Sequence, residues 1–199
     1  MITGRRPYKQ EARAASTQRT REALLDAADQ ELYADRWRQA SLDSLARKAG
    51  VTKQTLLRHF GSKDGLLLQA LGRGAIDVFN QRFDPPSADI GGAVENLLDH
   101  YHAWGERSLR IGAWQRGPTT LAKLSQLARQ AHYNWVEHAF GQWLEPLEEQ
   151  TRRRRRAALI ALCDVNTWWL LSHDLELSRA EMQATLTDGI ERLLESSLD

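Results

Sequence analysis

The chain is short of cysteine, because Cys163 is the only one among its 199 residues. A single thiol forms no disulfide within the chain, which is typical of the reducing cytoplasm, where we expect this protein. Cys163 lies in an apolar helical pattern, so we expect a small buried residue and not a nucleophile.

Long apolar runs are missing as well. No stretch approaches the roughly 18 residues of a membrane-spanning helix. The first 16 residues are basic but lack the apolar stretch of a signal peptide. Hydrophobic residues make up 42% of the chain and charged residues 27%, as in an ordinary soluble globular protein with no membrane partner.

Motifs for catalysis and metal binding are absent too. We find no nucleophile motif, no paired carboxylates and no glycine-rich phosphate loop, so the sequence does not favour an enzyme or a cofactor. The histidines lack metal-ligand spacing, since His100 and His102 belong to different helix faces. We therefore expect no metal site.

Charge is unevenly distributed, although the formal net charge is only +1. Residues 1–63 contain 13 Lys and Arg against 7 Asp and Glu, whereas residues 64–199 contain 14 against 19. A basic first third suggests a polyanionic partner for that part alone, although a solvated basic face would have the same composition.

Apolar residues repeat with the helical period of 3.6, and no stretch alternates as a strand would. We predict an all-α fold of about nine helices, with a three-helix N-terminal domain and a larger C-terminal helical domain. The expected helices span 17–35, 42–49, 53–60, 63–83, 89–105, 107–116, 119–145, 153–172 and 178–196. The expected divisions are a flexible basic arm at 1–16, a first domain at 17–63, a connecting helix at 64–83 and a second domain at 84–199.

Residues 41–60 have the spacing of two helices that cross steeply at a tight turn. Ala46 is small enough for the crossing point, Gly50 can adopt a positive φ, and Leu56 can anchor the second helix. Ser41, Thr52 and Ser62 are suitable N-caps. The pattern favours a DNA-binding helix-turn-helix, although an ordinary helical hairpin would also satisfy it.

The second of these helices has an outward face suited to DNA. If Leu56 and Phe60 point to the core, Gln54 and Arg58 point away from it. Gln pairs with adenine and Arg with guanine in the major groove, and Leu57 could touch a thymine methyl. The expected DNA-contacting residues are Ser41, Thr52, Lys53, Gln54, Thr55, Leu57, Arg58, His59 and Lys63.

The stretch 20–67 resembles the N-terminal domain of the TetR family of bacterial transcriptional regulators. The specific part of the match is AGVTKQTLLRHFGSKDGLL, residues 49–67. The resemblance implies a homodimeric repressor of double-stranded DNA that is released from a palindromic operator by a ligand. Leu57 departs from the family, which usually has an aromatic residue there, so one typical phosphate contact is missing. The arm at 1–16 could reach a minor groove or remain a solvated tail.

The resemblance also implies that residues from about 84 onward bind an effector and dimerise. The last two helices are apolar along one side, as in a core or an interface. The expected dimer residues are Leu162, Val165, Trp169, Met182, Leu186, Ile190 and Leu193. Six of the seven tryptophans lie in this part, which suggests a pocket for a small apolar or aromatic effector. Its expected residues are Trp104, Trp114, Trp135, Trp168, His100, His138 and Asn166.

Two alternatives stay open for this second part. It could respond to a protein partner, or it could dimerise without any small-molecule effector.

The run 152–156 consists of five arginines, which we interpret as a solvated helix start that pairs with nearby glutamates. Gly72 and Gly74 are hinge candidates within the expected connecting helix.

Overall fold

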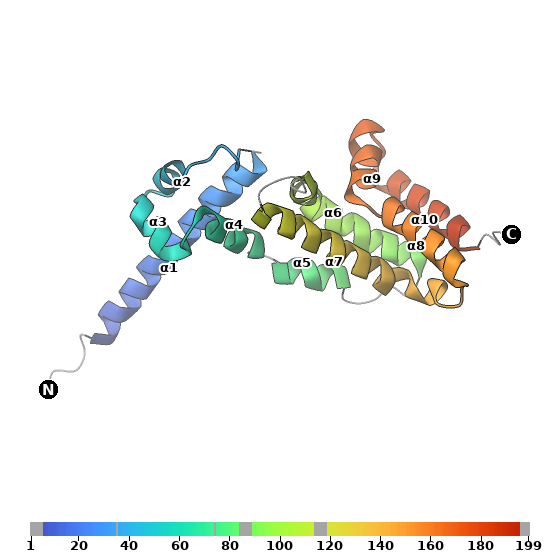
Figure 1. Ribbon diagram of the computed structural model, residues 1–199, viewed down its shortest axis with the longest axis horizontal. Coiled ribbons are helices and arrows are strands. Elements are labelled where there is room, and N and C mark those ends of the chain that lie inside the picture. Colours follow the sequence, from blue (N-terminus) through green and yellow to red (C-terminus); the bar gives the residue numbers. More distant parts are fainter. Residues whose placement is uncertain (1–5, 35, 74, 84–88, 114–118, 196–199) are drawn as a thin grey trace. The chain divides into compact units, whose positions relative to one another are not determined.

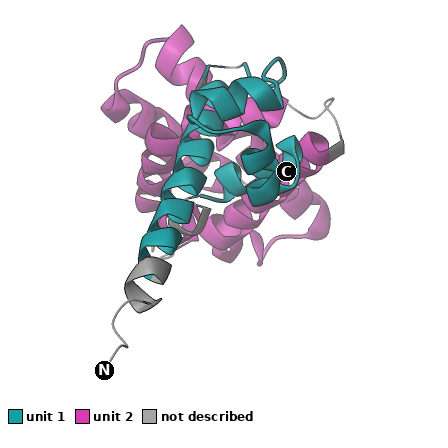
Figure 2. Cartoon of the chain, turned by 90° about the vertical axis from the view of Figure 1, so that its left-hand side faces the viewer, with its two compact units in different colours: residues 1–75 teal, residues 76–199 magenta. Residues whose placement is uncertain are grey.

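The computed structural model describes residues 6–34, 36–73, 75–83, 89–113 and 119–195, and every regular element among them is helical (Figure 1). The prediction of an all-α fold is therefore confirmed. The described elements are ten α-helices and one π-helical segment, against the nine helices expected. The chain divides into two compact units, residues 1–75 and 76–199 (Figure 2).

The first unit contains α1 (Arg6–Tyr33), α2 (Leu42–Lys48), α3 (Lys53–Phe60) and α4 (Lys63–Gly72). Helix α1 packs against α2 and α4, and α3 packs against both α2 and α4. All four helices contribute apolar side chains to a common core. Its buried residues are Leu24, Leu25, Ala27, Ala28, Leu32, Trp37, Leu45, Ala46, Leu56, Phe60, Leu66, Leu67 and Ala70.

The second unit is built around one long helix, α6 (Ile90–Ala113), which packs against α7, α9 and α10. The other elements are α5 (Ala75–Phe83), α7 (Thr119–Leu144), α8 (Glu149–Leu162), α9 (Val165–Trp169), the π-helical segment η2 (Leu170–Asp174) and α10 (Arg179–Glu195). Its apolar core includes Trp135 and Phe140 from α7 and Leu97, Leu98 and Tyr101 from α6.

Helix α1 begins earlier than expected. Residues 6–16 are helical, so the prediction of a flexible arm is wrong for the part of it that the structure describes. Pro7 is the second residue of α1, in the first turn, where a helix tolerates proline because no intrahelical N–H bond is lost there. Three alanines follow at 12, 14 and 15 and favour helix strongly.

The expected single helix at 63–83 is two helices. Helix α4 ends at Gly72 and α5 begins at Ala75, so one belongs to the first unit and the other to the second. Arg73 follows α4 in an extended conformation, with φ −67° and ψ 120°. Gly74 lies outside the described residues.

The reverse error occurs in α6, where two helices were expected and one continuous helix runs through Gly105. A Cβ at Gly105 would lie 2.4 Å from Cζ3 of Trp168. Glycine therefore serves close packing there and does not break the helix.

The expected helix at 153–172 begins at Glu149 and is interrupted after Leu162. Asp164 starts the new helix α9, because its carboxylate accepts a hydrogen bond from the Asn166 N–H. Arg155 is buried and its Nη1 donates to the Leu194 carbonyl, so the arginine run is only partly solvated.

Candidate functional site

The turn between α2 and α3 has the geometry that the sequence predicts. Gly50 has φ +69°, a conformation that disfavours a side chain, and the Val51 N–H donates to the Ala46 carbonyl over 2.9 Å. Ala46 and Leu56 are both buried where the two helices meet. The prediction of a helix-turn-helix is therefore confirmed at its backbone and at its anchoring residues.

Hydroxyl caps hold the starts of these helices. Ser41 accepts from the Ser44 N–H at 3.0 Å, and the Ser41 N–H donates to Ser44 Oγ at 2.9 Å, which forms a reciprocal capping box. Thr52 accepts from the Thr55 N–H at 3.2 Å, at the start of α3. The three expected N-caps, which include Ser62 at α4, are all present.

The outward face of α3 is exposed. Gln54, Leu57 and Arg58 all project to solvent, and within the described part of the chain Gln54 and Arg58 have no intramolecular hydrogen-bond or ion-pair partner. Lys53 is also exposed and lies 3.3 Å from Asp43. Three side chains on one exposed, well-anchored face are thus available to an external partner.

Thr55 and His59, the other expected contacts on α3, are half-buried. The Thr55 hydroxyl lies 3.0 Å from that of Thr52, and the His59 ring packs beside Phe60.

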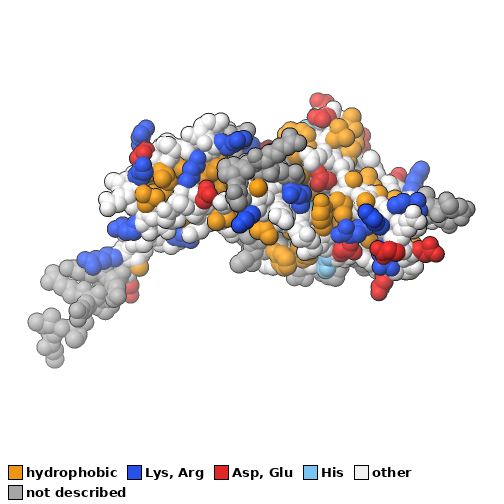
Figure 3. All heavy atoms as spheres, viewed as in Figure 1, with side chains coloured by type: hydrophobic (Ala, Val, Ile, Leu, Met, Phe, Trp, Pro, Cys, Tyr) orange, Lys and Arg blue, Asp and Glu red, His pale blue; other side chains and the backbone are white. Residues whose placement is uncertain are grey.

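On the face of the first unit that Figure 3 shows, Lys and Arg side chains are spread over the surface.

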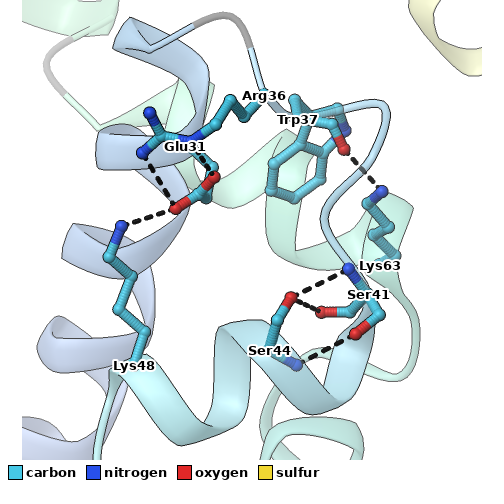
Figure 4. Close-up of polar contacts among 7 residues, drawn as sticks. All are labelled: Glu31, Arg36, Trp37, Ser41, Ser44, Lys48 and Lys63. Atoms are coloured by element: carbon cyan, nitrogen blue, oxygen red, sulfur yellow. Dashed lines mark hydrogen bonds and ion pairs between the residues drawn. The ribbon is translucent and has the colours of Figure 1, made fainter.

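Lys63 has a different place from the one expected. Its Nζ donates to the Trp37 carbonyl over 2.6 Å and lies 4.9 Å from the Trp37 ring centroid (Figure 4). Burial of the ammonium group lowers the pKa of Lys63. The side chain therefore fastens the loop before α2 to the start of α4.

A second polar contact fastens α2 to α1. Glu31 accepts from Lys48 Nζ at 2.5 Å and from Arg36 Nε at 3.1 Å (Figure 4). These two hydrogen bonds lower the pKa of Glu31. Polar contacts thus tie α2 to α1, and the loop before α2 to the start of α4.

Arg73 is a residue that the sequence did not single out. Its guanidinium binds Glu22, Asp26 and Asp29, three acidic side chains along α1. Burial opposes the charge of Arg73, but the hydrogen bonds to Asp29 and Asp26 outweigh it and raise the pKa of Arg73. The spacing 22–26–29 on one helix face was the available signal.

The expected effector residues are brought together only in part: the rings of His100 and Trp168 both lie beside that of Tyr101. Trp135 is fully buried, Trp168 packs against Gly105 and Tyr101, and Trp104 lies beside Arg107. His138 and Asn166 are exposed, and Trp114 lies outside the described residues.

His100, in contrast, is buried, and its Nδ1 donates to Gln81 Oε1 at 3.2 Å. Burial, followed by the nearby charge of Arg82, lowers the pKa of His100 to about 3. His100 is therefore neutral at physiological pH.

The polar residues at the end of α5 were not predicted from the sequence. Arg82 is buried between aromatic rings, 4.6 Å from the Trp135 centroid and 5.4 Å from that of Tyr101. Its Nη2 lies 3.1 Å from Nδ1 of His132. A basic residue near the end of an amphipathic helix is usually exposed to solvent. The apolar periodicity of the sequence therefore did not predict that Arg82 is buried.

The expected dimer residues fall into two groups. Met182, Leu186 and Ile190 are buried within one chain, where α10 packs on α6. Within one chain they belong to the core, and their contribution to a dimer interface stays a prediction. The expected residues that remain partly exposed are Leu162, Val165, Trp169 and Leu193.

Comparisons with known proteins agree with this geometry. Residues 24–70, which include the whole helix-turn-helix, match the family model described as bacterial regulatory proteins, tetR family. Over these residues the chain is similar to the TetR family. Its members are transcriptional regulators that bind DNA and typically act as dimers. No curated protein matches the chain in a sequence comparison.

Solved structures share the TetR-type fold of this chain. A TetR-family transcriptional regulator from Streptomyces coelicolor is 21% identical, with a TM-score of 0.60 over 88% of this chain and 80% of the other. A transcriptional regulator from Rhodococcus is 16% identical, with a TM-score of 0.64 over 90% and 96%. The fatty acid degradation regulator FadR from Bacillus halodurans is 17% identical, with a TM-score of 0.55 over 90% and 96%.

None of the helices that the described residues form is both long and apolar enough to cross a membrane. No group of three or more His, Cys, Asp or Glu side chains among them is arranged to hold a metal ion.

Proposed function

We propose that this protein is a homodimeric cytoplasmic repressor of the TetR family. It would bind a palindromic operator through α3 and leave it when a small apolar or aromatic ligand binds the second unit. The observation that carries the proposal is the exposed face of α3. Its Gln54, Leu57 and Arg58 side chains have no role in the core, while the helix itself is anchored by Leu56 and Phe60.

The chemistry of that face suits the major groove. Arg58 can bond both acceptors of guanine, Gln54 can bond adenine, and Leu57 can contact the methyl group of thymine. The proposed phosphate contacts around them are Lys53, Thr55, His59 and the cap residues Ser41 and Thr52. Lys63 contributes to this set mainly by holding the domain together, because its ammonium group is bound to the Trp37 carbonyl.

A dimer would present two such helices to successive major grooves. Half-site centres would then lie about 34–36 Å apart, one turn of B-DNA, or a multiple of it. The partly exposed residues Leu162, Val165, Trp169 and Leu193 are the proposed contributors to the dimer interface. The experiment is selection of binding sites from random duplex DNA with the full chain, followed by footprinting. We expect a two-fold symmetric sequence, whereas an asymmetric site bound by one chain would contradict the proposal.

Effector control is tested separately. Compounds that raise the thermal unfolding temperature are identified first, since a ligand of the folded state must stabilise it. Each is then added to the operator complex while fluorescence anisotropy reports DNA release. Release by apolar or aromatic compounds supports the proposal. If no stabilising compound dissociates the complex with DNA, the alternative is favoured. In that alternative the second unit responds to a protein partner or only forms the dimer.

A further inference from the structure

Arg82, near the end of α5, is a buried cation with 7% of its surface exposed. A buried charge is unfavourable unless an opposite charge pairs with it. No Asp or Glu among the described residues lies within ion-pair distance of Arg82. Its Nε is buried and has no hydrogen-bond partner. Part of the hydrogen-bonding capacity of this guanidinium is therefore unused.

The neighbours that Arg82 does contact are neutral. Its Nη2 donates to Nδ1 of His132, because the other ring nitrogen, Nε2, donates to the Ile160 carbonyl over 3.0 Å. Burial lowers the pKa of His132 and raises the pKa of Tyr101 to about 12. The Trp135 ring covers the guanidinium from a centroid distance of 4.6 Å. Aromatic faces and a neutral imidazole compensate a positive charge only in part.

Asp164 is an acidic group whose charge acts on the neighbours of Arg82. Its charge acts on Tyr101, His132 and Cys163, but its carboxylate caps α9 by accepting from the Asn166 N–H at 2.9 Å. The Cys163 thiol supplies no negative charge either, since burial raises its pKa to about 12. The interior around Arg82 thus contains one positive charge without an anion in contact with it.

We propose that Arg82 is the anchor of the effector site and binds the carboxylate of a small aromatic acid. The proposal rests on the proposed function, and it gives the ligand a charge that the sequence did not suggest. A guanidinium presents its N–H groups as a planar fork that matches a carboxylate. One buried cation balances one negative charge, which favours a monocarboxylate over a phosphate dianion.

The surroundings of Arg82 favour an aromatic body for this acid. The ring centroids of Trp135 and Tyr101 lie 4.6 and 5.4 Å from the guanidinium carbon of Arg82. Ring faces and edges of this kind bind another aromatic ring well.

Binding there would also act on α5. The polar contacts of this helix with the rest of its unit run through Gln81, which bonds Asn96 and His100 of α6, and through Arg82, which bonds His132 of α7. A carboxylate that takes over Arg82 competes with His132 for it. Because α5 begins three residues after α4 ends, such a change reaches the chain segment that leads to the DNA-binding unit.

The experiment uses the full chain and three acids: phenylacetate, 3-phenylpropionate and 4-phenylbutyrate. Their primary amides serve as neutral controls of the same shape. Binding is measured by the shift of the thermal unfolding temperature and by quenching of tryptophan fluorescence. We expect at least one acid to bind and its amide to bind about thirtyfold more weakly or not at all, because the amide leaves the guanidinium without a counter-charge. Equal binding of acid and amide, or no binding by any acid, would overturn the proposal.

Two substitutions locate the site. Arg82→Met removes the charge at similar volume and should abolish the preference for acid over amide while the unfolding temperature of the free protein stays the same or rises. Arg82→Lys keeps the charge without the fork and should bind the acid with intermediate affinity, which provides a test if the first variant does not fold. Undiminished acid binding by either variant refutes the assignment. Arg153→Met, an exposed residue of α8, is the matched control and should bind as the wild type does.

Operator release, followed by anisotropy with the same compounds, separates this proposal from the proposed function. Acid binding that depends on Arg82 but leaves DNA bound supports the site and contradicts ligand-controlled repression. Release by neutral aromatic compounds, with no preference for acids, supports ligand-controlled repression and refutes the role of Arg82.

Discussion

Replacement of Gly105 by alanine tests how the core of the second unit is packed. The new Cβ would lie 2.4, 2.6 and 2.9 Å from three carbon atoms of the Trp168 ring, where ordinary contacts are 3.4–4 Å. The ring would have to retreat by about 1 Å. It is held by the rings of Tyr101 and His173, at centroid distances of 5.7 and 5.5 Å, so this movement disturbs other contacts.

Overpacking of this kind costs about 1–3 kcal/mol, while alanine in place of helical glycine gains about 1 kcal/mol. Gly141→Ala is the matched control, because it lies within α7 and a Cβ there would meet nothing within 4 Å. We expect Gly141→Ala to be neutral or stabilising and Gly105→Ala to be less stable than it by about 1–3 kcal/mol. Urea unfolding followed by tryptophan fluorescence measures both. Equal stabilisation by the two substitutions would refute the packing argument.

Three further predictions concern polar groups that are buried or half-buried. Burial lowers the pKa of His100 to about 3 in the folded chain. Below about pH 6.5 the unfolded chain therefore binds a proton at His100 and the folded chain does not. As the pH is lowered from about 6.5 to 3, the free energy of unfolding should fall by up to about 1.4 kcal/mol per pH unit. Urea midpoints at pH 7 and 5 should show a smaller fall in His100→Gln, and an unchanged one would contradict the burial. Lys63→Met should destabilise the first unit by about 1–2 kcal/mol. Lys53→Met changes an exposed residue and should lower only the affinity for DNA and the salt dependence of that affinity. Equal thermal stability of the two variants would be inconsistent with the contacts of Lys63. Arg73→Gln should lower the unfolding temperature because it leaves three carboxylates of α1 without their shared cation, and Arg38→Gln, an exposed change, should not; the same result for both would show that the cluster contributes nothing.

Local signals in the sequence were sufficient for the helix-turn-helix. A glycine that needs a positive φ, a small residue at the helix crossing and hydroxyl caps each act within a few residues of one another. Gly50, Ala46, Ser41 and Thr52 are therefore found where the spacing predicts them.

Helix ends depended on context that periodicity does not contain. Gly105 resembles a helix breaker until Trp168 is seen against it, and Pro7 resembles one until it is seen in a first turn. The break between α4 and α5 was hidden because both helices continue the same apolar pattern.

Contacts between distant residues were beyond the sequence. Lys63 and Trp37 are 26 positions apart, and Arg82 and His132 are 50 apart. An amphipathic helix can present Lys and Arg to solvent or bury their charge against a partner, and the composition is the same in either case. For the same reason an apolar stripe on α10 did not distinguish a core from an interface, and Met182 belongs to the core.

The central claim is that the outward face of α3 reads DNA sequence. The most direct test compares the wild type with Arg58→Ala and with Arg153→Ala, an exposed arginine of α8, on the selected operator and on all its single-base variants. We predict that Arg58→Ala loses about 1–3 kcal/mol of binding free energy and loses discrimination at one base pair of each half-site, while Arg153→Ala matches the wild type. Unchanged affinity and unchanged preference at every position in Arg58→Ala would contradict the account.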